Sequence, residues 1–70
     1  MNMNKYKGMK KRQLNEALIE AAKEGQLENV KELINLGANV KANNNSPLFE
    51  SCYNGHTKTA EYLISQGAKV

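Results

Sequence analysis

The sequence has few of the residues that stabilise a small domain through disulfides or metal sites. It has no tryptophan or aspartate, one proline, and a single cysteine and histidine, Cys52 and His56. One cysteine excludes an intramolecular disulfide, and one cysteine with one histidine falls short of the four ligands of a structural zinc site. No apolar run approaches the roughly 20 residues of a membrane span. The basic N-terminus also lacks the apolar stretch of a secretory signal. We therefore expect a cytoplasmic protein without a metal or cofactor.

The charge is distributed unevenly along the chain. The 70 residues carry a net charge of +3, and a chain of this length forms one small domain with a marginal core. Five positive charges stand in the first dozen residues: Lys5, Lys7, Lys10, Lys11 and Arg12. From residue 13 onward, five lysines oppose seven glutamates, a balance of −2. Residues 1–13 are therefore interpreted as a basic arm, either flexible or capping the rest of the fold.

An internal repeat organises the remainder of the chain. Residues 17–40 recur without a gap, thirty residues later, as residues 47–70, with eight identities in twenty-four positions. The identical pairs are Leu18/Leu48, Glu20/Glu50, Gly25/Gly55, Leu33/Leu63, Ile34/Ile64, Gly37/Gly67, Ala38/Ala68 and Val40/Val70. Self-similarity at this period is typical of stacked repeats.

Each copy predicts a helical hairpin. In the first copy, Leu14, Leu18, Ala21 and Ala22 form an apolar stripe at helical spacing, which predicts a helix from Leu14 or Asn15 to Glu24 with Asn15 as its cap. A second helix is expected over residues 28–36, ended by a glycine as the first one is. In the second copy, helices are expected over 47–54 and 58–66. The serine before Pro47 would cap the former.

These motifs together resemble the ankyrin repeat. Its T-P-L-H-x-A signature corresponds to residues 46–51, its G-H turn to residues 55–56, and its L-[LI]-x-x-G-A ending to residues 33–38 and 63–68. The resemblance implies an all-α fold with two helix-turn-helix repeats, at about residues 14–45 and 46–70, stacked side by side. Its usual period is about 33 residues. The period of 30 here therefore predicts a short β-turn or loop finger between the repeats.

The residues offer little for catalysis. Cys52 matches Ala22 in the first copy, so we expect it to be a buried small residue. The family uses the histidine of its G-H turn to bond loop backbone, and we expect the same of His56. The spaced glutamates are typical of a solvated helix face rather than an acid–base site. The sequence therefore predicts that the protein is not an enzyme.

The resemblance also implies a partner-binding surface on the first helix of each repeat and on the finger. The residues that match it are Glu20, Lys23, Glu24, Asn39, Lys41, Asn43, Asn44, Asn45, Glu50, Tyr53 and Asn54. Tyr53 is the strongest candidate, because exposed aromatic residues often anchor interfaces. Phe49, which replaces the family's histidine, is expected to pack under the finger, with presentation to a partner as the alternative.

Three functions remain open from the sequence. The leading hypothesis is a protein–protein interaction module, a small inhibitor or adaptor that masks a protein partner of unknown identity. The second is nucleic-acid or anionic-surface binding through the basic arm. The third is self-assembly as a homodimer or larger oligomer, because no third repeat follows to cover the apolar residues Ala60, Leu63 and Ile64.

Overall fold

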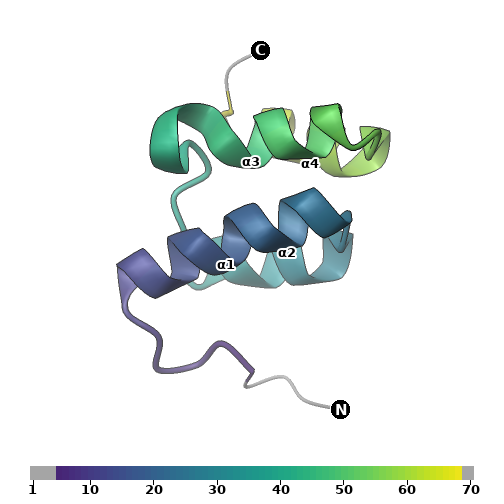
Figure 1. The fold of residues 1–70 in the computed structure, drawn as a ribbon. Helices are drawn as coiled ribbons and strands as arrows, with labels where there is room; N and C mark the ends of the chain where they lie inside the picture. The colour runs from purple at the N-terminus through teal and green to yellow at the C-terminus, as the bar shows by residue number, and fades with distance from the viewer. Residues whose placement is uncertain (1–4, 69–70) are drawn as a thin grey trace.

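The computed structural model describes residues 5–68, which form four helices and no strand. These are α1 (Lys11–Glu24), α2 (Leu27–Asn35), α3 (Ala42–Tyr53) and α4 (Thr57–Ser65). Figure 1 shows two helical hairpins stacked one above the other, with α1 and α3 in the nearer layer and α2 and α4 behind them. The predicted all-α stack of two helix pairs is confirmed.

The apolar stripe of α1 lies inside the stack as predicted, but the helix begins earlier than expected. Leu14, Leu18, Ala21 and Ala22 are all buried. The helix starts at Lys11 because the Lys10 N–H donates to Gln13 Oε1 over 2.9 Å, which satisfies a donor at the helix entry. The prediction of Asn15 as the cap is therefore wrong.

The Asn15 side chain instead holds the connection between the hairpins. Its Oδ1 atom accepts a hydrogen bond of 2.7 Å from the Asn39 N–H. Asn39 Oδ1 in turn accepts 2.9 Å from the Lys41 N–H. The connector is thus fastened to α1 by the Asn15 side chain and held internally by the Asn39 side chain.

The connector turns through three consecutive asparagines in the left-handed region, with φ of 52°, 58° and 73° for Asn43, Asn44 and Asn45. Asparagine tolerates this conformation better than most residues. The right-handed part of α3 therefore follows Asn45. Ser46 does not act as the predicted cap: its hydroxyl donates to the Asn43 carbonyl over 2.7 Å and closes the turn.

The core joins both hairpins. The side chains of Leu18, Val30, Leu33 and Leu63 are 0% exposed, and the alanine after each hairpin donates its N–H back to Leu33 or Leu63 over 3.0 Å. Tyr6 is buried in the same cluster, and Met9 packs against it. The described part of the N-terminal arm lies on the side of the first hairpin away from α3 (Figure 1).

Cys52 is exposed, which contradicts the prediction that it is buried. Its counterpart Ala22 is 0% exposed. The two positions are equivalent within a hairpin but differ in the neighbours that cover them. The second hairpin packs on the side of the first that carries Ala22, whereas within residues 5–68 no further helix pair lies on the corresponding side of α3 and α4.

Candidate partner-binding surface

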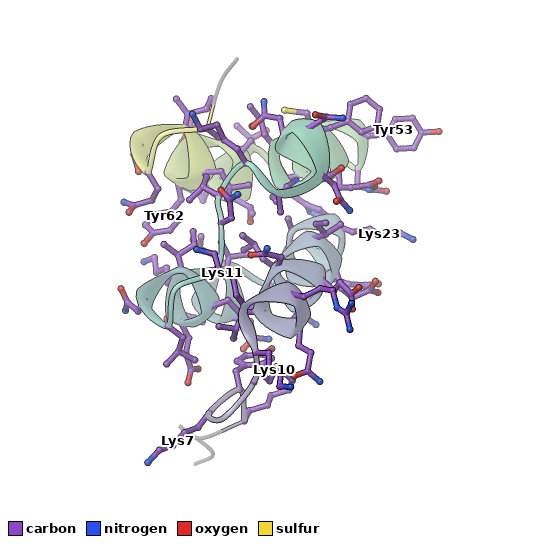
Figure 2. The ribbon with its side chains drawn as sticks, turned by 90° about the vertical axis from the view of Figure 1, so that its left-hand side faces the viewer. Lys7, Lys10, Lys11, Lys23, Tyr53 and Tyr62 are labelled. Carbon is purple, nitrogen blue, oxygen red and sulfur yellow. The ribbon has the colours of Figure 1, made fainter. Side chains whose placement is uncertain are left out.

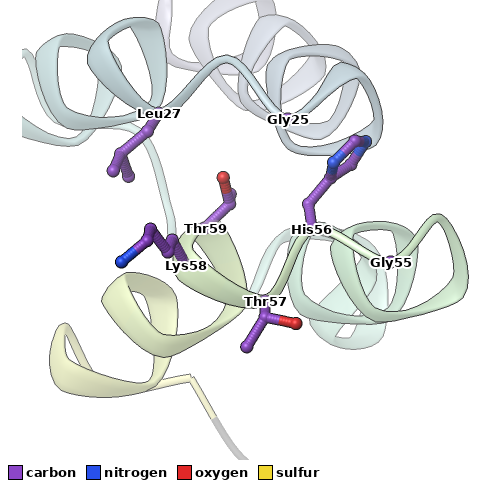
Figure 3. Close-up of a pocket in the computed structure, with 7 residues that line it drawn as sticks. All are labelled: Gly25, Leu27, Gly55, His56, Thr57, Lys58 and Thr59. Carbon is purple, nitrogen blue, oxygen red and sulfur yellow. The ribbon is translucent and has the colours of Figure 1, made fainter.

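His56 fastens the two hairpins together at their turns. Its Nε2 atom lies 3.1 Å from the Lys23 carbonyl oxygen, at the end of α1, and donates to it when that nitrogen carries the proton. Figure 3 shows the imidazole reaching from the second turn to Gly25 in the first. His56 thus contacts backbone as predicted, but its partner lies in the last turn of α1 rather than in a loop.

The close approach of His56 requires a glycine beneath it. A Cβ atom added to Gly25 would lie 2.6 Å from His56 Cγ, closer than real side chains come. Gly25 also has φ of +72°, which ends α1 in a left-handed turn. Gly55, its counterpart, has φ of +78° but nothing within 4 Å of an added Cβ. Steric crowding at the turn is therefore specific to the junction between the hairpins.

The side chains that could take part in metal or acid–base chemistry lie apart over residues 5–68. Within residues 5–68, no group of three or more histidine, cysteine, aspartate or glutamate side chains could hold a metal ion. The cleft beside the junction, lined by Leu27, Thr57 and Thr59 among others, contains His56 as its one imidazole, and Nε2 of that ring lies 3.1 Å from the Lys23 carbonyl oxygen.

The helical candidates for partner binding lie on the outer faces of α1 and α3. Glu20, Lys23, Glu24, Tyr53 and Asn54 are exposed, and Glu50 is half-buried. Tyr53 is 78% exposed. In Figure 2, Lys23 and Tyr53 project from the same side of the stack, one above the other. Because α1 and α3 stack in the same layer, the two helices that carry these six candidates lie side by side.

Phe49 completes this surface, contrary to the expectation that it packs under the finger. It is 62% exposed, and its ring stacks on Tyr53 with centroids 6.0 Å apart and an interplanar angle of 17°. Residues four apart on a helix are surface neighbours. The Phe49–Tyr53 spacing was therefore a signal for this contact in the sequence. We call these two residues the aromatic pair.

The connector candidates are exposed at Asn39, Lys41, Asn43 and Asn44 and half-buried at Asn45. Several of their polar groups are engaged inside the connector, as the Asn39 and Asn43 bonds show. Asn54 likewise donates its side-chain amide to the Glu50 carbonyl over 2.8 Å. Partner contacts by these residues stay a prediction.

Of the three residues predicted for self-association, Ala60 and Ile64 line a common groove, whereas Leu63 is inaccessible. Leu63 is 0% and Ala60 7% exposed, because both belong to the hydrophobic core cluster, while Ile64 is 41% exposed. A shallow groove of about 320 Å³ lies beside Ile64 and is also lined by Cys52, Ala60 and Glu61. We call it the end groove. The end groove, rather than Leu63, is the accessible part of this side of α3 and α4.

The basic residues of the N-terminal segment, Lys5, Lys7, Lys10, Lys11 and Arg12, are exposed. Tyr6 is not available to stack on a base, because its side chain is buried in the core cluster. Lys5 Nζ also lies 5.3 Å from the centre of its ring. Nucleic-acid binding by this segment stays a prediction. Within residues 5–68, no helix has the length and apolar character required to cross a membrane.

The fold and the turn geometry define a protein of stacked helical hairpins. A family model described as ankyrin repeats (3 copies) matches residues 2–70. The chain therefore belongs to the ankyrin repeat family, as its motifs indicated, although it shows two helical hairpins over residues 5–68. No curated protein and no solved structure gave a match. Ankyrin repeats are generally protein–protein interaction modules and typically have no enzymatic activity.

Proposed function

We propose that this protein is a non-enzymatic binding module, a small inhibitor or adaptor that masks one protein partner. The observation that carries the proposal is the exposed aromatic pair on α3. Together, Phe49 and Tyr53 present two large rings to solvent on an otherwise polar helix face. Folding alone gives no reason for this exposure, whereas aromatic residues dominate the energetics of protein interfaces.

The stacking contact within the pair also supports a binding role. Tyr53 and Phe49 stand on successive turns of a helix and stack on each other, a contact that favours one arrangement of the two rings before a partner arrives. Preformed anchors lose less conformational entropy on binding than flexible side chains do. The polar residues around them, Glu20, Lys23 and Glu50, would form the rim of such an interface.

Tyr53→Ala is expected to weaken capture of the protein partner at least tenfold, since truncating an anchor residue costs about 2 kcal/mol or more. Stability should change little because the side chain is 78% exposed. Affinity capture from an extract of the native host, quantified by mass spectrometry, measures the effect. Leu36→Ala is the matched control, since Leu36 is 43% exposed and lies at the end of α2 in the other layer. Equal capture by the Tyr53 variant would refute the chosen surface.

A second candidate function is self-association through the end groove. The groove is the counterpart of the side of the first hairpin on which the second one packs, with Cys52 in the place of Ala22 and Ile64 in the place of Ile34. That correspondence supports docking of another molecule, such as a second copy.

If the end groove forms a homodimer, Ile64→Lys is expected to convert the dimer to a monomer in light scattering at tens of micromolar. The charge would have to be desolvated in the interface. Because Ile64 is 41% exposed in the single chain, the thermal stability of the monomer should hardly change. A wild-type protein that is monomeric at this concentration would count against self-association.

A further inference from the structure

The aromatic pair lies in an acidic setting. On α3, Glu50 is three residues from Tyr53 and adjacent to Phe49, so its carboxylate borders the pair on the helix surface. On the neighbouring α1, the exposed residues that match Glu50, Tyr53 and Asn54 in the internal repeat are Glu20, Lys23 and Glu24. Together with Glu50, these side chains are three carboxylates and one ammonium, with a formal net charge of −2.

The other two tyrosines of the chain each have a lysine ammonium group close to the ring. Lys5 Nζ lies 5.3 Å from the centre of the Tyr6 ring. Lys31 Nζ, on α2, lies 5.5 Å from the centre of the Tyr62 ring on α4. For Tyr53, the ring contact observed within residues 5–68 is with Phe49, and the ring remains 78% exposed.

From this setting we propose that the surface formed by the aromatic pair, Glu50 and Glu20 takes a positively charged, arginine-bearing peptide segment of the partner protein. A cation over an aromatic face is attracted by the negative potential of the ring. Arginine fits better than lysine, because its planar guanidinium stacks on a ring while its N–H groups bind a carboxylate in a fork.

The inference rests on the proposed function, since it gives the chemistry of the partner at the same surface. It adds a requirement that a merely apolar anchor would not impose. The partner must bring positive charge, and the binding must weaken as salt rises, because exposed charges are screened. The tyrosine face and the carboxylates should then contribute separately to affinity.

A peptide titration tests the inference on the whole chain. Isotope-labelled protein is titrated, at low salt, with a five-residue peptide of alternating glycine and arginine, and amide shifts are followed by NMR. Peptides with glutamate or glutamine in place of arginine are the comparisons. We expect the arginine peptide alone to shift amides of residues 20–24 and 49–54, with an affinity that falls as salt is added.

Two variants separate the ring from its apolar bulk. Tyr53→Leu keeps a large apolar side chain but removes the ring, and is expected to weaken arginine-peptide binding about three- to fivefold, the value of an exposed cation–π contact. Tyr53→Phe keeps the ring face and should bind within about twofold of wild type, because the quadrupole remains. Glu50→Gln should reduce the salt dependence.

The results that would contradict the inference differ from those that would contradict the proposed function. Equal shifts from the glutamate or glutamine peptide, or unchanged affinity of Tyr53→Leu, would overturn the inference and leave the proposed function standing. If no peptide shifts these amides while host capture still depends on Tyr53, the inference alone is wrong. If capture does not depend on Tyr53, the proposed function is wrong as well. Concentration-dependent shifts of the same amides without peptide would identify a second copy as the occupant and overturn the inference.

Discussion

Leu33→Ala is expected to leave little of the protein folded at room temperature. Leu33 is 0% exposed on α2, and truncating such a buried leucine costs about 2–5 kcal/mol through lost burial and the cavity left behind. A single core in a chain of this size rarely supplies more than about 3–5 kcal/mol in total. Circular dichroism at the helical band, followed during heating and urea titration, measures the loss.

Leu36 provides the control for this prediction. It belongs to the same hairpin but is 43% exposed, so Leu36→Ala should change the free energy of unfolding by no more than about 0.5 kcal/mol. If both variants unfold at the same denaturant concentration as wild type, Leu33 does not occupy the core. Such a result would contradict the described packing of α2.

Gly25→Ala is expected to destabilise the protein by about 3 kcal/mol, because two costs add. An alanine in the left-handed region costs about 1–2 kcal/mol by itself. The new methyl group would also displace the His56 ring, which lies 2.6 Å from the Cβ position, and break the bond from His56 Nε2 to the Lys23 carbonyl. Losing a hydrogen bond of this kind costs about 0.5–1.5 kcal/mol.

Gly55→Ala isolates the first cost, since Gly55 has φ of +78° and nothing within 4 Å of an added Cβ. It should lose about 1–2 kcal/mol, and each 1 kcal/mol corresponds to a fall in Tm of about 4–8 °C for a domain of this size. Equal losses for the two alanine variants would mean that His56 does not pack on Gly25 in solution. The junction would then differ from the one described.

The order of the helices was predictable because the apolar stripe and the repeat reinforced each other. Leu18, Leu33 and Leu63 are buried as the pattern required. The start of α1 was not predictable, since the capping bond between Lys10 and Gln13 uses residues with no strong preference for that position. The Asn15–Asn39 bond joins residues far apart in sequence, and no local pattern indicates it.

The surface was harder to predict than the core, because exposure depends on neighbours rather than on local pattern. Comparison with Ala22 predicted that Cys52 is buried, yet equivalent positions in a stack are equivalent only when both are covered. Phe49 was expected under the finger, but the connector folds on its own asparagine and serine bonds and leaves the ring outside. The end groove near Ile64 is exposed for the same reason as Cys52: within residues 5–68, no further helix pair covers that side of α3 and α4.

The most direct test of the central claim, that the α1–α3 surface binds a protein partner, is site-specific photo-crosslinking in extract of the native host. A benzophenone amino acid is placed at Tyr53 in one variant and at Leu36 in another, since both side chains are exposed and lie in different layers. We expect one dominant covalent protein adduct from position 53 and none from position 36. Adducts from position 36 alone would place the partner on the other layer and refute binding at the α1–α3 surface.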